Sequence, residues 1–213
     1  MNKKTTFTTL AILGALGASG FLVLSRLESK IELNPYQALG TVAAEETIKL
    51  MGDKDQIVII AQDTSEFDMP ALAAQLNAFQ ATARKTAKVT VAIEKVKMDA
   101  MTMMAAGGRV PGARFLETLQ KYPKAGAIIL FLGFPQLAGR DLDALRQRVP
   151  KMIVVAAYRP DYQELLERRL IDLAIVPRLD ALPENAPKPR TLREWFAQEY
   201  VILAPETTAA MPR

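Results

Sequence analysis

The side chains whose chemistry could hold a ligand stand directly after predicted β-strands. In an open, parallel α/β sheet these positions meet at one edge, and ligands bind there where the strand order reverses. A carboxylate, hydroxyls, amides, aromatic rings and guanidinium groups can together hold a small polar ligand. The candidate ligand-binding residues are Gln62, Asp63, Thr64, Ser65, Phe134, Gln136, Tyr158, Arg159 and Arg178. The alternative is that Asp63 or Ser65 only caps the next turn, as polar loop residues commonly do.

The composition argues against most catalytic chemistry. The chain has no histidine and no cysteine, so it lacks the commonest general base, the commonest transition-metal ligand and any thiolate nucleophile. Residues 62–70 contain no glycine and the chain has no Gly-Lys-Ser/Thr run, which argues against dinucleotide and P-loop sites. We therefore expect a binding protein with no catalytic residue, no cofactor and no metal site. A hydrolase or transferase that uses Asp63 and Ser65 is a weaker alternative.

Residues 98–112 combine methionines with a glycine-rich run. The methionines are Met98, Met101, Met103 and Met104, and the sequence GGRVPG follows at residues 107–112. We expect a short helix that buries its methionines, followed by a Gly/Pro turn, because methionine is most often a filler of hydrophobic cores. The alternative is an exposed, adaptable contact surface, which the flexible methionine side chain also suits.

Five predicted strands alternate with helical patterns and must position these residues. The runs at 56–61 (QIVIIA), 126–132 (GAIILFL), 152–157 (MIVVAA) and 172–176 (DLAIV) are short and apolar, as expected for strands covered on both faces. The run at 88–97 (KVTVAIEKVK) alternates instead and is typical of a strand at a sheet edge. The pattern predicts an α/β fold with a doubly wound, three-layer parallel sheet in the flavodoxin-like order 2-1-3-4-5.

An uncharged segment at residues 5–25 follows Lys3 and Lys4. A helix of this length spans about 30 Å, the thickness of a bilayer core, so we expect one N-terminal transmembrane helix. A cleaved signal peptide is the alternative, although the apolar run resumes at residues 21–24 where an exported chain normally turns polar. The basic residues before the segment predict that the rest of the chain is on the periplasmic side of a bacterial inner membrane.

The remaining chain divides by composition. We expect a membrane anchor or signal peptide at residues 1–25, a stalk at 26–35 and a Rossmann-like α/β domain at 36–181. Residues 182–213 are predicted to be a Pro-rich linker with a helix and a strand that pack back on the domain. Without Lys3 and Lys4, the 27 basic residues become 25 against 23 acidic ones, so no basic block indicates nucleic acid binding. An oligomer stays open, since Gly14 and Ala18 have the spacing that lets membrane helices approach closely.

Several strands carry a resemblance to a known family. The segments QIVIIAQD, AIILFL and MIVVAA, together with LLERRLIDLAIV at residues 165–176, resemble one lobe of the type 1 periplasmic binding proteins. The resemblance spans residues 56–178 and rests on fold-level patterns. It implies a ligand-binding lobe. Proteins of that family bind ligand in the cleft between two lobes, whereas this chain is long enough for one, so a partner or a second copy would have to supply the other wall.

The sequence thus favours a membrane-tethered, periplasmic binding module without catalysis. Its partner is expected to be a small polar ligand or an envelope protein. The alternative is a structural subunit of a membrane or envelope complex, which would use the membrane segment, the methionine cluster or the C-terminal tail as its contact.

Overall fold

The computed structural model describes residues 31–137, 139–146, 150–157, 159–180 and 185–205. The predicted membrane segment at residues 5–25 and the candidate Tyr158 lie outside these ranges. No helix in the described ranges is long enough and apolar enough to span a bilayer.

A six-stranded sheet forms the middle layer, in the order β2-β1-β3-β4-β5-β6. The first five strands are parallel and have the predicted order, with the half-exposed strand β2 at the edge. The strands are β1 (Gln56–Gln62), β2 (Thr90–Val96), β3 (Ala127–Leu130), β4 (Lys151–Val155), β5 (Leu173–Pro177) and β6 (Tyr200–Leu203).

The prediction of a purely parallel sheet is wrong for the last strand, because β6 pairs antiparallel with β5. A parallel strand would need a crossover that returns the chain to the opposite edge of the sheet. Helix α8 (Leu192–Glu199) instead leads directly into Tyr200, which pairs with Pro177 at the end of β5. Strand β6 therefore starts beside the end of β5 and runs antiparallel to it.

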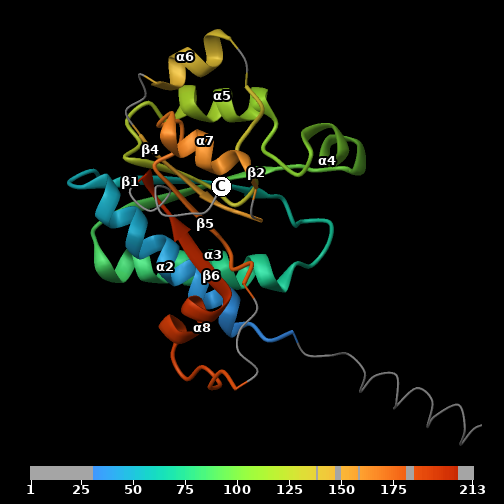
Figure 1. The fold of residues 1–213 in the computed structure, drawn as a ribbon. Coiled ribbons are helices and arrows are strands. Elements are labelled where there is room, and N and C mark those ends of the chain that lie inside the picture. Colours follow the sequence, from blue (N-terminus) through green and yellow to red (C-terminus); the bar gives the residue numbers. More distant parts are fainter. Residues whose placement is uncertain (1–30, 138, 147–149, 158, 181–184, 206–213) are drawn as a thin grey trace, which may run out of the picture. The chain divides into compact units, whose positions relative to one another are not determined.

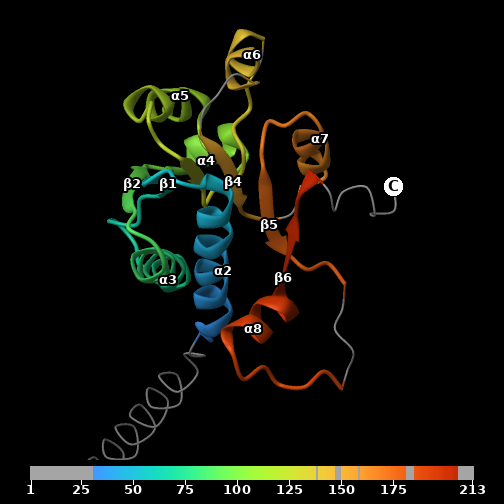
Figure 2. The same ribbon diagram turned by 90° about the vertical axis from the view of Figure 1, so that its left-hand side faces the viewer.

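Helices cover both faces of the sheet (Figures 1 and 2). Helices α5 (Gly112–Lys121), α6 (Arg140–Arg146) and α7 (Asp161–Glu167) cover one face, and α2 (Asn34–Met51), α3 (Pro70–Thr86) and α8 cover the other. Strand side chains alternate between the two layers. In β1, Val58 and Ile60 pack on the first face, while Ile57 and Ile59 pack on the second.

Helices α2 and α3 approach each other very closely. A Cβ atom at Gly40 in α2 would lie 2.1 Å from the backbone oxygen of Gln75 in α3. Glycine is therefore required here by the neighbouring backbone, although it lowers the intrinsic helix propensity of α2.

The strands β1 to β5 all end at one edge of the sheet, which we call the carboxyl edge. Helix α2 lies on the sheet and reaches β1 through a loop of only four residues, 52–55. It therefore runs antiparallel to β1 and begins, at Asn34, at the carboxyl edge. The chain enters the domain at this edge.

Helix α4 (Ala100–Ala106) follows β2 and buries none of its own residues. Met101 and Met104 are 82% and 84% exposed, and Met103 is exposed as well. The prediction that this helix buries its methionines is therefore wrong, and only Met98, before the helix, is in the core. The reason is that Val110 and Phe115 already cover the sheet here, so α4 stands away from the layers (Figure 1).

Candidate functional site

The candidates that follow β1 are largely engaged in a turn. Gln62 is buried at the end of the strand, and the backbone N–H of Asp63 donates to the carbonyl oxygen of Val96 at 2.8 Å. The backbone N–H of Ser65 donates to Oδ1 of Asp63 at 3.1 Å, and this hydrogen bond holds the pKa of that carboxyl below its usual range. Asp63 thus has the capping role that was the alternative in the sequence, while Thr64 is half-buried and Ser65 is exposed.

The two candidates that follow β3 differ in exposure. Phe134 is only 3% exposed and packs edge-on against Phe115, with ring centroids 6.0 Å apart. Its ring is therefore part of the core between the sheet and α5, and not of the ligand-accessible surface. Gln136 is exposed and lies beside the start of α5, where its backbone oxygen is close to Gly112.

The two candidate arginines lie in different settings. Arg159, after β4, donates from Nη2 to the carbonyl oxygen of Gly107, and its Nε lies beside Gly133. Arg178, after β5, donates from Nη2 to the carbonyl oxygen of Ala197 at 3.0 Å. Arg178 therefore attaches the end of α8 to the sheet, whereas Arg159 lies at the centre of the carboxyl edge.

The structure adds residues to Arg159 that sequence reasoning did not assign to a site. Nη2 of Arg109 forms an ion pair with Oδ2 of Asp161 at 2.9 Å, and both side chains are half-buried. Backbone hydrogen bonds between residues 108–110 and Gly133 hold Arg109 beside the end of β3. We call Arg109, Arg159, Asp161 and Tyr162 the central cluster.

The central cluster has hydrogen-bonding capacity that is not used. Oδ1 of Asp161 and the hydroxyl of Tyr162 are buried, and neither has a hydrogen-bond partner among the residues that the structure describes. Burial raises the pKa of Tyr162 to about 12, so its hydroxyl stays protonated and can donate. Unsatisfied buried polar atoms are rare in proteins. Tyr162 is fully buried, so the groups of the cluster that face the surface are those of the half-buried Arg109, Arg159 and Asp161. Only the glycine run before Arg109, and the closeness of Asp161 to Arg159 in the chain, could have suggested this group.

A charged groove that contains no residue of the central cluster lies between the end of β2 and helix α5. It encloses about 720 Å³ and includes Asp63 in its wall. The other charged residues of its wall are Glu94, Lys95, Lys97, Asp99, Arg114, Glu117 and Lys121. The predicted single site is thus divided: Asp63 faces the groove, Arg159 belongs to the central cluster and Arg178 to neither.

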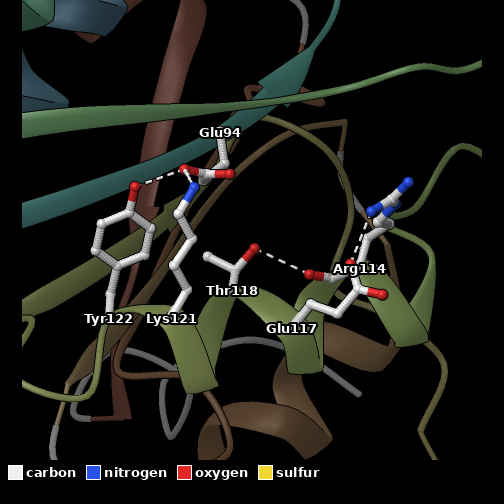
Figure 3. A network of polar contacts seen from close by, with 6 residues as sticks. All are labelled: Glu94, Arg114, Glu117, Thr118, Lys121 and Tyr122. Carbon is white, nitrogen blue, oxygen red and sulfur yellow. Dashed lines mark hydrogen bonds and ion pairs between the residues drawn. The ribbon is translucent and has the colours of Figure 1, made fainter.

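Glu94 connects the edge strand to α5 in this groove (Figure 3). Its Oε1 accepts hydrogen bonds from Nζ of Lys121 at 2.8 Å and from the hydroxyl of Tyr122 at 2.5 Å. Burial alone would raise the pKa of Glu94, but the hydrogen bonds from Lys121 and Tyr122 outweigh it and lower the pKa. Glu94 is therefore charged at neutral pH. Its ion pair with Lys121 joins β2 to α5 and stabilises the groove.

Replacing Glu94 with glutamine should destabilise the folded chain by about 1 kcal/mol at pH 7. Because the folded state lowers the pKa of Glu94, this contribution is complete above its ordinary pKa of about 4.3 and is lost as the pH falls through the folded-state value. Urea unfolding of the full chain at pH 7 and pH 3 measures the difference. The matched control is Glu117→Gln, which breaks the exposed pair with Arg114 and should cost under about 0.5 kcal/mol. An equal effect of Glu94→Gln at both pH values would contradict the assignment.

No group of three or more acidic side chains in the described ranges is arranged to hold a metal ion. The polar groups of the central cluster are instead guanidinium, carboxylate and phenol groups, with the carbonyl oxygen of Gly107 beside Arg159. These groups suit a ligand with several hydroxyl or other hydrogen-bonding groups.

The fold matches those of solved binding proteins at low sequence identity. A solute-binding protein of an ABC transporter from Agrobacterium vitis, solved with bound allitol, has a TM-score of 0.55 and 16% identity; the match covers 82% of this chain and 62% of that one. An arabinose-binding protein from Geobacillus stearothermophilus has a TM-score of 0.52 and 12% identity, with coverages of 84% and 63%. A protein named XylFII has a TM-score of 0.50 and 16% identity, with coverages of 66% and 48%.

These matches confirm the expected fold of a lobe of a type 1 periplasmic binding protein. The chain spans less than two thirds of each of the three proteins. No protein-family model matches the sequence, and no curated protein matches it.

Proposed function

We propose that this chain, which has the fold of one binding-protein lobe, is a non-catalytic module that binds a small polyhydroxylated ligand at its carboxyl edge. We further propose that residues 5–25 tether it to the bacterial inner membrane with the domain on the periplasmic side. The observation that carries the proposal is the central cluster. It lies where strands β3 and β4 end, next to the point between β1 and β3 at which the strand order reverses. Open α/β sheets bind ligands at this point.

The chemistry of the cluster suits a sugar or a polyol. A carboxylate and a guanidinium group each present two hydrogen-bonding atoms in one plane, and this geometry fits two neighbouring hydroxyl groups. The side chains of Arg109, Arg159 and Asp161 are half-buried and supply the guanidinium and carboxylate groups that a ligand would contact, whereas Tyr162 is fully buried and belongs to the core behind them. The solved proteins with this fold include one with allitol bound and one described as binding arabinose, which supports the same ligand class.

The experiment uses the full chain in detergent and titrates arabinose, allitol and related sugars and polyols by calorimetry. At least one should bind, and Asp161→Asn should weaken its affinity about tenfold or more, because hydrogen bonds to charged groups contribute about 1.5–3 kcal/mol. The control is Arg168→Ala, which removes only an exposed pair with Glu164 on α7. If none of the compounds gives a heat of binding, the proposed ligand class is wrong. In a second arm, an Asp53→Cys variant, with its thiol in an exposed loop away from the carboxyl edge, should react with an impermeant maleimide in intact spheroplasts. Reaction only after lysis would overturn the periplasmic location.

A second candidate function is a structural subunit of an envelope complex. The exposed methionines of α4 favour it, because large exposed apolar side chains often mark contacts between proteins. Purification from detergent extracts distinguishes the two candidates, since a structural subunit would retain a different protein and bind no sugar.

A further inference from the structure

Among the described residues from Leu33 onward, the exposed large hydrophobic side chains lie at one edge of the sheet. Phe67 is in the loop after β1, Met101, Met103 and Met104 are in the helix directly after β2, and Leu179 follows the end of β5. From Leu33 onward, the described residues carry no other exposed large hydrophobic side chain. All five therefore lie at the carboxyl edge, and we call them the edge patch.

The edge patch flanks the central cluster on both sides. The strand order places the ends of β2 and β1 on one side, with Phe67 and the methionines, and the end of β5 on the other, with Leu179. Arg109, Arg159 and Asp161 lie between them, beside the ends of β3 and β4. Along the carboxyl edge the surface is thus apolar, then polar, then apolar. A partner that contacts both flanks would enclose the polar centre.

An identical chain fits this surface. Helix α4 (AMTMMAA) contains no charged residue, so two copies of it do not repel each other, and methionine side chains adapt to one another in shape. The charges next to the patch are mixed: Lys97 forms an ion pair with Glu66 at 3.7 Å, and Asp99 caps α4. In a two-fold interface the same patch contacts its own copy, and a surface that carries both signs of charge can pair opposite charges there.

The point at which the chain enters the domain also favours a second copy. The 32 residues that precede Leu33 join α2 at the carboxyl edge, where the contact would form. Segments held in one membrane would raise the local concentration of each domain for the other.

We propose that a second copy of this chain covers the carboxyl edge, so that two central clusters face each other and form one enclosed ligand site. The enclosed site rests on the proposed ligand-binding function, whereas the contact between edge patches does not. Each lobe supplies one wall, and the apolar flanks exclude water around the polar centre.

The absence of cysteine makes a direct test possible. Single variants Phe67→Cys, Met104→Cys and Leu179→Cys place one thiol at the carboxyl edge of the full chain. The matched controls, Asp53→Cys and Lys124→Cys, place it in exposed loops that precede β1 and β3, at the opposite edge. Under oxidation with copper phenanthroline in membranes, at least one edge variant should form a disulfide-linked species of twice the 23.4 kDa chain mass, well above the controls. Edge variants at the level of the controls, or an adduct of another mass, would overturn the proposal.

A second measurement does not depend on thiol geometry. The double variant Met101→Ser/Met104→Ser should fold, because α4 buries none of its residues, and should shift the full chain from dimer to monomer in sedimentation velocity in detergent. Lys124→Ser is the control that should leave the dimer intact. A wild-type monomer at all concentrations that still binds a sugar would overturn the dimer and keep the proposed function. A dimer that binds no member of the ligand panel would support the contact between edge patches and overturn the proposed ligand-binding function.

Discussion

Phe134→Ala is expected to destabilise the folded chain by about 4 kcal/mol. The side chain is 3% exposed and packs against Phe115 in the core between the sheet and α5. Its removal loses the transfer free energy of the ring and leaves a cavity that the surrounding strands cannot fill. Because small domains are stable by only about 5–15 kcal/mol, the variant should lose a large part of its stability. Urea unfolding of the full chain, followed by the fluorescence of the single tryptophan, Trp195, measures the loss.

Two further variants separate this structural role from the ligand-binding role expected from the sequence. Phe134→Leu fills most of the space and should recover much of the stability. Gln136→Ala, at the exposed position two residues later, should change the unfolding free energy by less than about 0.5 kcal/mol. A Phe134→Ala variant that unfolds like wild type but no longer binds ligand would show that the ring faces the ligand.

Gly40→Ala is expected to destabilise the chain by about 3 kcal/mol. The new Cβ would lie 2.1 Å from the backbone oxygen of Gln75, and the carbonyl carbon of Gln75 would lie at 2.9 Å. These are backbone atoms inside α3, so the two helices must separate or tilt to make room. Helix propensity alone predicts the opposite sign, a gain of about 1 kcal/mol, because alanine is the better helix former. The direction of the change therefore tests the close approach directly.

The control for this variant is Thr41→Ala, the next residue of the same helix. Thr41 faces a groove between α2 and α3 that has room for side chains, so the change should be neutral or slightly stabilising. Both variants are compared with wild type by urea unfolding of the full chain. A more stable Gly40→Ala variant would mean that α2 and α3 are farther apart than described here.

The strands and their order were predictable because strands that are buried on both faces consist mostly of apolar residues. The runs at 56–61, 126–132, 152–157 and 172–176 are apolar on both faces, and the structure buries them between two helical layers. The alternation in β2 marks a strand with one neighbour, which placed it at the edge. The antiparallel pairing of β6 was missed, since a four-residue strand has the same composition in either direction.

The candidate site was only partly predictable. Positions after strands were expected at one edge, and Arg159 is indeed there, but its neighbours come from other loops. Arg109 and Asp161 are 52 residues apart in the chain and form their ion pair only because the loops after β2 and β4 meet. Asp63 and Phe134 have residue types that suit a ligand, yet one is engaged in a turn and the other in the core. Residue type alone cannot distinguish these roles, because it does not report what a side chain contacts.

The sequence by itself determined the α/β layering, the order of the five parallel strands and the absence of histidine and cysteine chemistry. These properties follow from local periodicity and from composition, which need no knowledge of distant contacts. Only the tertiary structure decided that the methionines of α4 are exposed, that Arg109 and Asp161 meet beside Arg159, and that the exposed apolar side chains gather at the carboxyl edge. Each of these depends on which segments far apart in the chain come together, and the free energy of packing selects that arrangement for the fold as a whole.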